Sequence, residues 1–365
     1  MVVKVLKKVV NFEKMSYIKN DEEMFSNHKG MIDCALGTNP FGYSETIKSK
    51  KDLEHYGMND YPDYPYDQLK KAVAKHWSDT IIFDSKRIEI GSGTLSLLIN
   101  INKMFVDVDT TVLGYCPQFT EYISDVRSLG GRYEFILLRS ENDLELDIRE
   151  LIRALDEKQS LVYVDNPNNP TGQIIPLDDL RLLAVEAERM GICLVVDEAY
   201  GDFMEKSNSA LNLVDEFDNI FVVRSLSKGF GLAGIRVGYM VCSKALQTYY
   251  KKVAPPFCVT SHSESVARSA LRDYGFVLRS IEKIVRRKKK ILAATTKLEI
   301  MKTDLSVPIM VLRHPDVTVD LHLELLRHNV LTESGADFIG MGKNAVRMRV
   351  PKEVDQLIEA LKKVV

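Results

Sequence analysis

The sequence predicts an α/β fold in which a mainly parallel central sheet lies between helices, followed by a smaller α+β unit. From about Asp63 onward, short runs rich in β-branched apolar residues alternate with longer helical patterns, as in proteins whose sheet has helices packed on its faces. Several runs are apolar throughout, which is typical of strands buried on both faces of a parallel sheet. The clearest candidate strands are Thr111–Tyr115, Leu161–Asp165, Cys193–Asp197 and Phe221–Arg224.

The elements that follow indicate a second unit. The helical pattern between the strands is clearest at Leu177–Met190, where apolar residues recur three and four positions apart. Residues 243–300 indicate a mostly helical segment, and Pro255–Pro256 marks a break within it. The strand-like Ala345–Val350 and the helix Glu353–Val364 complete the smaller unit. We predict an N-terminal arm (1–45) that joins the small domain, a large domain (46–255), and an interdomain helix with the small C-terminal domain (256–365).

The composition excludes several classes of protein. The 365 residues are 45% hydrophobic and 27% charged with a formal net charge of −2, without the basic excess of a nucleic-acid-binding domain. The basic run at residues 286–290 is interpreted as the solvated face of a long helix. No stretch approaches the roughly 20 apolar residues that span a bilayer, and the N-terminus lacks the features of a signal peptide. The five cysteines show no metal-ligand or redox spacing. We therefore expect a cytoplasmic protein that binds no metal, nucleic acid or membrane.

Polar residues follow three of the candidate strands. These segments are NPNNPTG (166–172), DEAY (197–200) and SLSKGFGLAGIR (225–236). Taken alone, the first is a tight turn, the second an acidic helix cap, and the third a glycine-rich loop suited to an anion such as phosphate. Because ligands in open α/β sheets bind beyond the carboxyl ends of the strands, we expect these groups to converge.

In this order, the three segments resemble the fold-type I enzymes that use pyridoxal 5′-phosphate (PLP), the aspartate aminotransferase superfamily. The most specific part is the Ser-x-Ser-Lys block, with Arg236 eight residues after Lys228. Within the superfamily the chain most resembles the histidinol-phosphate aminotransferases and the related threonine-phosphate decarboxylases, from about Ala35 to the C-terminus. The resemblance implies an aspartate aminotransferase-like fold whose large domain binds PLP.

The resemblance also implies catalytic roles for Lys228, Asp197 and Tyr200. Lys228 would carry PLP as a Schiff base and then move the proton at the substrate's α-carbon. Asp197 would face the pyridine nitrogen and keep it protonated, so that the ring accepts electrons. Tyr200 and Asn169 would hydrogen-bond the phenolic oxygen of the cofactor.

Further cofactor contacts follow from the same resemblance. Ser225, Ser227 and Arg236 would hold the phosphate, with the guanidinium as a fixed positive fork. A second phosphate-binding turn falls on GSGT (91–94), which opens a helical segment. The backbone amides at this helix start would point at the phosphate; the predicted contacts are Gly93, Thr94 and Leu95.

Two aromatic residues match family positions, and each has a simpler explanation. Phe119 aligns with the aromatic residue that stacks on the cofactor ring, although a lone phenylalanine is more often part of a core. Tyr61 aligns with the tyrosine that reaches the phosphate of the partner subunit, which implies a homodimer. A tyrosine in a surface turn is the alternative for Tyr61.

The substrate-binding residues fit the family pattern less well. Arg347 aligns with the arginine that binds the substrate carboxylate, and Asn39 falls on a substrate-lining turn. The two families that the chain most resembles place a phosphate-binding arginine some 14 residues before the carboxylate arginine. This chain has Glu333 at that position or, with a small gap, Thr332. A carboxylate there would repel a phosphate dianion. We therefore hypothesise that the side-chain pocket takes an uncharged or cationic group with Glu333 as its partner, or that Glu333 points to solvent and Arg349 acts instead.

The predicted activity is transamination between an amino acid or related amine and a 2-oxo acid. A decarboxylase of the threonine-phosphate type is the alternative, since the same residues serve loss of the α-carboxylate. A non-catalytic PLP-fold binding protein is a more remote alternative, because the set of catalytic residue types is complete.

Overall fold

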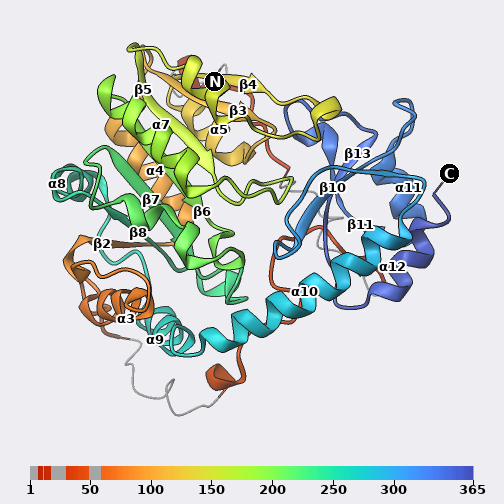
Figure 1. Ribbon diagram of the computed structural model, residues 1–365. Coiled ribbons are helices and arrows are strands. Elements are labelled where there is room, and N and C mark those ends of the chain that lie inside the picture. The colour runs from red at the N-terminus through yellow and green to blue at the C-terminus, as the bar shows by residue number, and fades with distance from the viewer. Residues whose placement is uncertain (1–6, 11, 18–29, 49–58, 365) are drawn as a thin grey trace, which may run out of the picture.

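The centre of the computed structural model is a seven-stranded sheet between two layers of helices, which confirms the predicted α/β fold (Figure 1). The structure describes residues 7–10, 12–17, 30–48 and 59–364. In sheet order the strands are β2 (Ile88–Gly91), β8 (Gly238–Cys242), β7 (Ile220–Ser225), β6 (Cys193–Glu198), β5 (Gln159–Asp165), β3 (Thr111–Cys116) and β4 (Arg132–Leu137). Neighbouring strands pair in parallel from β7 to β4, whereas β8 is antiparallel to both of its neighbours.

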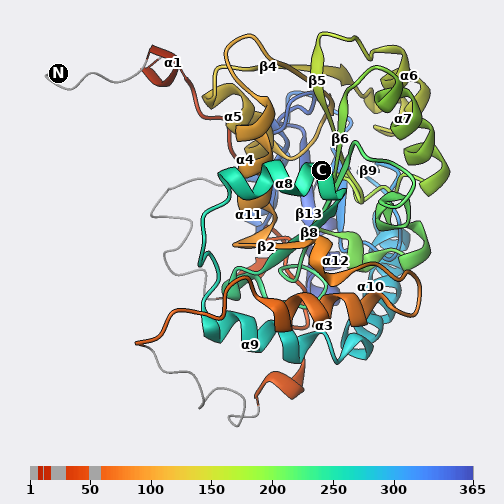
Figure 2. The same cartoon turned by 90° about the vertical axis from the view of Figure 1, so that its left-hand side faces the viewer.

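Alternating side chains of the buried strands fill two separate cores. Leu161 and Tyr163 of β5 pack beneath α4 and α5, whereas Val162 and Val164 face the core that contains residues of α3 and α7. This alternation is the period of two expected for a strand. The helices of the first layer are α4 (Gly93–Phe105), α5 (Thr120–Ser128) and α8 (Lys244–Val253). Those of the second are α6 (Ile148–Arg153), α7 (Leu177–Arg189), α3 (Asp67–Trp77) and α9 (Ser261–Ala270), of which α3 and α9 lie side by side (Figures 1 and 2).

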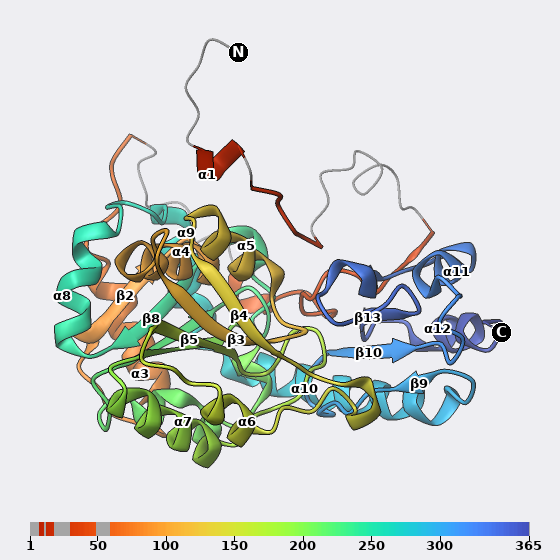
Figure 3. The ribbon, with the colours of Figure 1, turned by 90° about the horizontal axis from the view of Figure 1, so that it is seen from above.

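A smaller four-stranded sheet lies beside the large one and is reached by the long helix α10 (Tyr274–Ala294) (Figures 1 and 3). Its strands, in sheet order, are β12 (Glu333–Ser334), β13 (Ala345–Arg349), β10 (Ile309–Arg313) and β9 (Glu299–Ile300), and its helices are α11 (Leu321–Arg327) and α12 (Val354–Leu361). In the N-terminal segment, α1 spans Lys7–Val10, and β1 (Ile32–Asp33) pairs in parallel with β11 (Val330–Leu331). The described end of the arm thus joins the small unit; the domain boundaries at 45 and 255 stay a prediction.

The prediction for the basic run at 286–290 was wrong for Lys288. The side chain of Lys288 is fully buried, because it falls on the same face of α10 as Ile284 and Ile291. Its ammonium group donates to the Thr303 hydroxyl and to the carbonyl oxygens of Asp304, Val307 and Ile309, at 2.6–3.0 Å. This lysine therefore fastens α10 to the loop that precedes β10. Within the described part of the chain, no helix combines the length and the apolar character needed to cross a membrane.

Candidate active site

The three polar segments converge on one cavity of about 270 Å³ at the carboxyl ends of β5, β6 and β7. The predicted residues that line it are Thr94, Leu95, Phe119, Asn169, Asp197, Tyr200, Ser225, Ser227, Lys228 and Arg236. The predicted residues that do not line this cavity are Gly93, Tyr61, Asn39, Arg347 and Glu333. Sequence reasoning missed Lys14, Tyr17, Glu121 and Asp165, which also line it.

Asp197 presents a buried carboxylate to this cavity from the end of β6. The Tyr163 hydroxyl donates to its Oδ2 at 3.0 Å, and the backbone N–H of Ala199 donates to its Oδ1 at 2.9 Å. Burial and the neighbouring charge of Asp165 raise the pKa of Asp197 to about 7. A carboxylate taken out of water in this way favours a cationic or proton-bearing group opposite it. The carboxylate of Asp197 is therefore suited to face a protonated pyridine nitrogen.

Lys228 follows β7 and lines the same cavity. Burial lowers its pKa, and the positive charges of Arg347 and Arg236 lower it further. A lowered pKa increases the share of neutral amine, the form that attacks an aldehyde and accepts a proton. The Asn39 amide donates to the carbonyl oxygen of Gly229 at 2.8 Å. In this structure Asn39 therefore holds the loop next to Lys228.

Tyr200 and Asn169 are held by specific contacts on the other side of the cavity. A Cβ atom at Gly37 would lie 1.7 Å from the Tyr200 hydroxyl, so only glycine fits beside that ring. The Asn169 Oδ1 atom accepts a hydrogen bond from Arg347 at 2.9 Å. Because the oxygen of the amide is engaged, its Nδ2 is the group that can donate to a ligand oxygen.

A cradle for an anion lies at the N-terminus of α4. The φ angle of Gly93 is +77°, and a Cβ atom there would lie 2.3 Å from Nη2 of Arg236. A Cβ atom at Gly238 would lie 2.9 Å from the backbone nitrogen of Thr94. These glycines let the guanidinium and β8 pack closely against the helix start, and the cavity beside them is lined by Thr94, Leu95 and Arg236. The Arg236 guanidinium lies 3.5 Å from the Ser227 hydroxyl. Backbone amides at a helix start and an arginine form a phosphate site.

The aromatic and charged residues at the edges of the site differ in their surroundings. Phe119 lines the cavity, whereas Tyr61 is 81% exposed and its ring packs on Phe257, with centroids 4.8 Å apart. On the small sheet, β12 pairs with β13 so that Glu333 lies opposite Arg347. The two buried side chains approach to 3.4 Å.

Tyr17 of the N-terminal arm packs over Arg347. The Tyr17 ring stacks on Phe338, with centroids 5.2 Å apart, and lies 4.5 Å from the guanidinium carbon of Arg347. Arg349, the neighbouring candidate, contacts Asp33 at 3.1 Å and Thr38 instead. Because Tyr17 is distant in sequence from every motif, no local pattern indicates its position. Glu121, two residues after Phe119, adjoins a segment that the sequence does single out.

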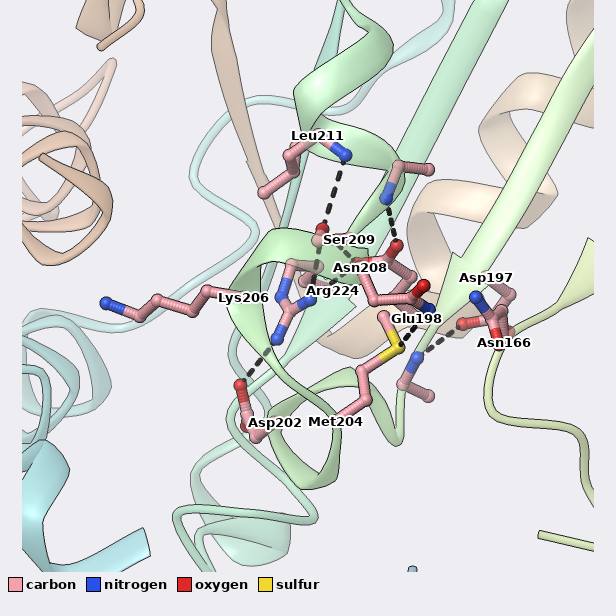
Figure 4. A network of polar contacts seen from close by, with 12 residues as sticks. Asn166, Asp197, Glu198, Asp202, Met204, Lys206, Asn208, Ser209, Leu211 and Arg224 are labelled. Atoms are coloured by element: carbon pink, nitrogen blue, oxygen red, sulfur yellow. Dashed lines mark hydrogen bonds and ion pairs between the residues drawn. The ribbon is translucent and has the colours of Figure 1, made fainter. Parts of the chain in front are cut away.

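A buried ionic network fixes the segment that follows Asp197 (Figure 4). Arg224, at the end of β7, donates to Glu198 and, at 2.7 Å, to Asp202. Glu198 in turn accepts from the Ser209 hydroxyl and the Ala210 backbone N–H, both at 2.6 Å. Register pairing places Glu198 opposite Arg224 on adjacent strands. The network thus joins the strand ends that carry Asp197 and Ser225.

We expect Arg224→Ala to destabilise the protein by about 3–5 kcal/mol, because it removes the cation that pairs with the buried carboxylates of Glu198 and Asp202. Chemical denaturation followed by circular dichroism measures this change. The matched control is Arg181→Ala, which removes the exposed pair with Glu216 and is expected to cost under about 1 kcal/mol. Equal losses in the two variants would contradict the role given to Arg224.

A protein with this sheet and this combination of amine, carboxylate and anion cradle is a PLP-dependent enzyme of the aspartate aminotransferase-like fold. The sequence model for aminotransferase class I and II matches residues 29–361, so the chain belongs to that family. It is 29% identical to a histidinol-phosphate aminotransferase from Clostridium novyi, over 88% of this chain and 87% of the relative. It is also 29% identical to a protein named as a threonine-phosphate decarboxylase from Caldanaerobacter subterraneus, over 96% and 95% of the two chains.

A solved structure has the same fold. The histidinol-phosphate aminotransferase of Sinorhizobium meliloti, determined in complex with pyridoxal-5′-phosphate, superposes with a TM-score of 0.83 at 19% identity. The match covers 100% of this chain and 99% of that structure. The sequence comparisons thus place the chain in an aminotransferase family, and the structural comparison shows the same fold.

When bound, PLP supplies an aldehyde for covalent attachment and an electron sink for the substrate's α-carbon. The residues of this chain provide the remaining functions. Lys228 would supply the amine for attachment and the base that moves the α-proton. Asp197 would stabilise a proton on the ring nitrogen. Arg236 and the α4 N-terminus would bind the phosphate and so fix the orientation of the ring.

Proposed function

We propose that this enzyme transfers an amino group between an amino acid or related amine and a 2-oxo acid, and that its specific substrate carries no phosphate on its side chain. The pair Glu333–Arg347 carries this proposal. The buried carboxylate of Glu333, 3.4 Å from Arg347, stands where the families that the chain resembles place a phosphate-binding arginine, so a negative charge replaces a positive one. At such distances in a protein, one added negative charge weakens the binding of a dianion by a kcal/mol or more.

The roles assigned to the cofactor-binding residues are part of the same proposal. Their convergence on one cavity supports it, and so does the exclusive fit of glycine at Gly37 and Gly93. Arg347 is proposed to bind the substrate carboxylate after Tyr17, which now covers it, has moved aside. Glu333 then favours a neutral or cationic side chain.

The Glu333→Gln variant tests the charge argument. We expect the wild-type enzyme to prefer lysine-, arginine- or ornithine-like amines to histidinol phosphate and threonine phosphate. Removing the charge should raise kcat/KM for the phosphorylated compounds by about tenfold, which corresponds to about 1.4 kcal/mol of relieved repulsion. Steady-state kinetics on both groups of substrates give the ratio.

Glu299→Gln is the matched control, because Glu299 lies on the same small sheet and is solvent-exposed. It should leave the ratio unchanged. If wild-type enzyme shows a clear preference for histidinol phosphate or threonine phosphate, the proposal of a non-phosphorylated substrate is wrong, while the assignment of the family stands.

Decarboxylation is the second candidate, and one observation favours it. The relative named as a threonine-phosphate decarboxylase matches almost the full length of the chain. The catalytic residues do not distinguish transamination from decarboxylation. The α-carbon bond that is held perpendicular to the cofactor ring is the one that breaks. Carbon dioxide release separates the two reactions.

A cytoplasmic homodimer is proposed as the working form. Tyr61, Tyr64 and Phe257 form an exposed aromatic cluster, with centroids of the two tyrosine rings 4.8 and 5.3 Å from that of Phe257. Exposed aromatic groups of this kind are typical of protein interfaces. In the dimer, Tyr61 would reach the phosphate of the partner's cofactor.

A further inference from the structure

Asp165 is a buried carboxylate of the active site to which the roles above assign no function. It is the last residue of β5, it is 3% exposed, and it lines the same cavity as Asp197 and Lys228. The parallel pairing of β5 with β6 places Asp165 directly opposite Asp197. Side chains at paired positions of neighbouring parallel strands leave the same face, and the strands lie about 4.8 Å apart. The two carboxylates are therefore neighbours.

Four donors surround the Asp165 carboxylate. Its Oδ1 accepts from the Tyr115 hydroxyl at 2.7 Å, from Gln118 Nε2 at 3.1 Å and from Asn168 Nδ2 at 3.0 Å. Its Oδ2 accepts from the backbone N–H of Asn169 at 3.0 Å. None of these donors is a cation, so they stabilise the negative charge in place without neutralising it. Burial raises the pKa of Asp165 above its ordinary value, and the four hydrogen bonds limit this rise.

The same hydrogen bonds shape the turn beyond β5. Two of the four donors, Asn168 Nδ2 and the Asn169 N–H, belong to this turn. Asn168 also accepts from the Thr171 hydroxyl at 2.6 Å, which closes the turn on itself. The position of the Asn169 side chain in the cavity thus depends on Asp165.

The charge of Asp165 acts on the groups around it. These groups are Tyr115 and Cys116 on β3, Tyr133 on β4, Tyr163 on β5 and Asp197 on β6. Burial raises the pKa of each group, and the negative charge of Asp165 raises it further. The four phenol and thiol groups are uncharged at neutral pH. Asp197 is therefore the neighbour whose charge state Asp165 influences in the working range.

We propose that Asp165 is a positioning residue of the cofactor site: it fixes the turn that carries Asn169, and its negative charge strengthens the hold of Asp197 on the proton shared with the cofactor's ring nitrogen. The proton remains on this pair at a higher pH than Asp197 alone would allow. The ring therefore stays a good electron acceptor in neutral and mildly alkaline solution.

Asp165→Asn tests the charge in the holoenzyme, without substrate. Absorbance of the bound cofactor is followed from acid to alkaline pH in the wild type and the variant. Loss of one nearby negative charge disfavours the protonated, more cationic form. The midpoint of the absorbance transition is expected to fall by about one pH unit.

Tyr115→Phe is the matched variant, because it removes one donor and keeps the charge. It is expected to lower the thermal midpoint of the holoenzyme without lowering the absorbance midpoint. An unchanged absorbance midpoint in Asp165→Asn, or an equal fall in Tyr115→Phe, would show that Asp165 serves the structure alone and would overturn the proposal.

A wild-type measurement decides the matter if Asp165→Asn fails to fold. Carbon-13 NMR of aspartate carboxyl groups in the holoenzyme reports the charge of Asp165, whose resonance is assigned by its displacement in Tyr115→Phe. An ionised carboxylate at pH 7 supports the proposal, and a protonated one overturns it. If the wild type binds no PLP at all, the absorbance band is absent, which is a failure of the cofactor assignment and a different result.

Discussion

Lys228→Ala is expected to lower kcat for amino transfer by at least about 10³-fold, because it removes both the amine that attaches the cofactor and the base that moves the α-proton. The phosphate cradle and Asp197 remain in this variant, so cofactor should still bind without the covalent link. Stopped-flow absorbance with a donor amino acid measures the half-reaction.

A small primary amine added to the Lys228→Ala enzyme should restore part of the proton transfer, since the cavity left by the side chain accepts it. The control is Lys71→Ala, a change of an exposed lysine on α3, which should leave kcat unchanged. Full activity in Lys228→Ala would place the reactive amine elsewhere and would contradict the whole assignment.

Asp197→Asn is expected to lower kcat by about 10²–10⁴-fold, because the neutral amide no longer holds a proton on the ring nitrogen. In the apoprotein, by contrast, the same substitution should increase stability at neutral and alkaline pH. Burial raises the pKa of Asp197 to about 7, so the folded chain favours the protonated form more than the unfolded chain does. This contribution to stability is complete below about pH 4, the unfolded pKa, and is lost as the pH rises through 7.

The asparagine variant of the apoprotein should therefore be more stable than the wild type above pH 7, by about 2–4 kcal/mol. The two should be similar near pH 4. Chemical denaturation of the two apoproteins at several pH values measures the difference. A wild-type apoprotein that stays as stable as the variant at pH 8 would mean that Asp197 has a partner that relieves its burial.

The sheet and the cofactor side of the site could be predicted because both depend on local sequence. Continuous apolar runs identify buried strands, and each polar segment follows its strand directly. The rule that strand ends meet at one edge of a parallel sheet predicts that the segments with Lys228 and Asp197 converge, whereas their individual roles come from the family resemblance. Asp165 was predicted as the end of a strand, but two of its four hydrogen bonds come from Tyr115 and Gln118, which are about 50 residues earlier in the chain, so its role could not be foreseen.

The substrate side depends on contacts between distant parts of the chain. The pairing of Glu333 with Arg347 comes from the antiparallel register of β12 and β13, which a sequence pattern does not specify. The position of Tyr17 over Arg347 joins residues more than 300 apart in the chain. Lys288 was misjudged for a related reason: its neighbours in sequence are charged, and its burial follows only from the helical spacing to Ile284 and Ile291.

The central claim is that this chain performs transamination with PLP on Lys228. The most direct test is a single half-reaction: purified holoenzyme is mixed with amines and amino acids, phosphorylated ones included, and the absorbance of the cofactor is recorded while products are identified. We predict that the band of the lysine-bound cofactor is lost, that its amine form accumulates, and that a stoichiometric 2-oxo acid or aldehyde appears. Release of carbon dioxide with the original band restored would contradict transamination and identify a decarboxylase.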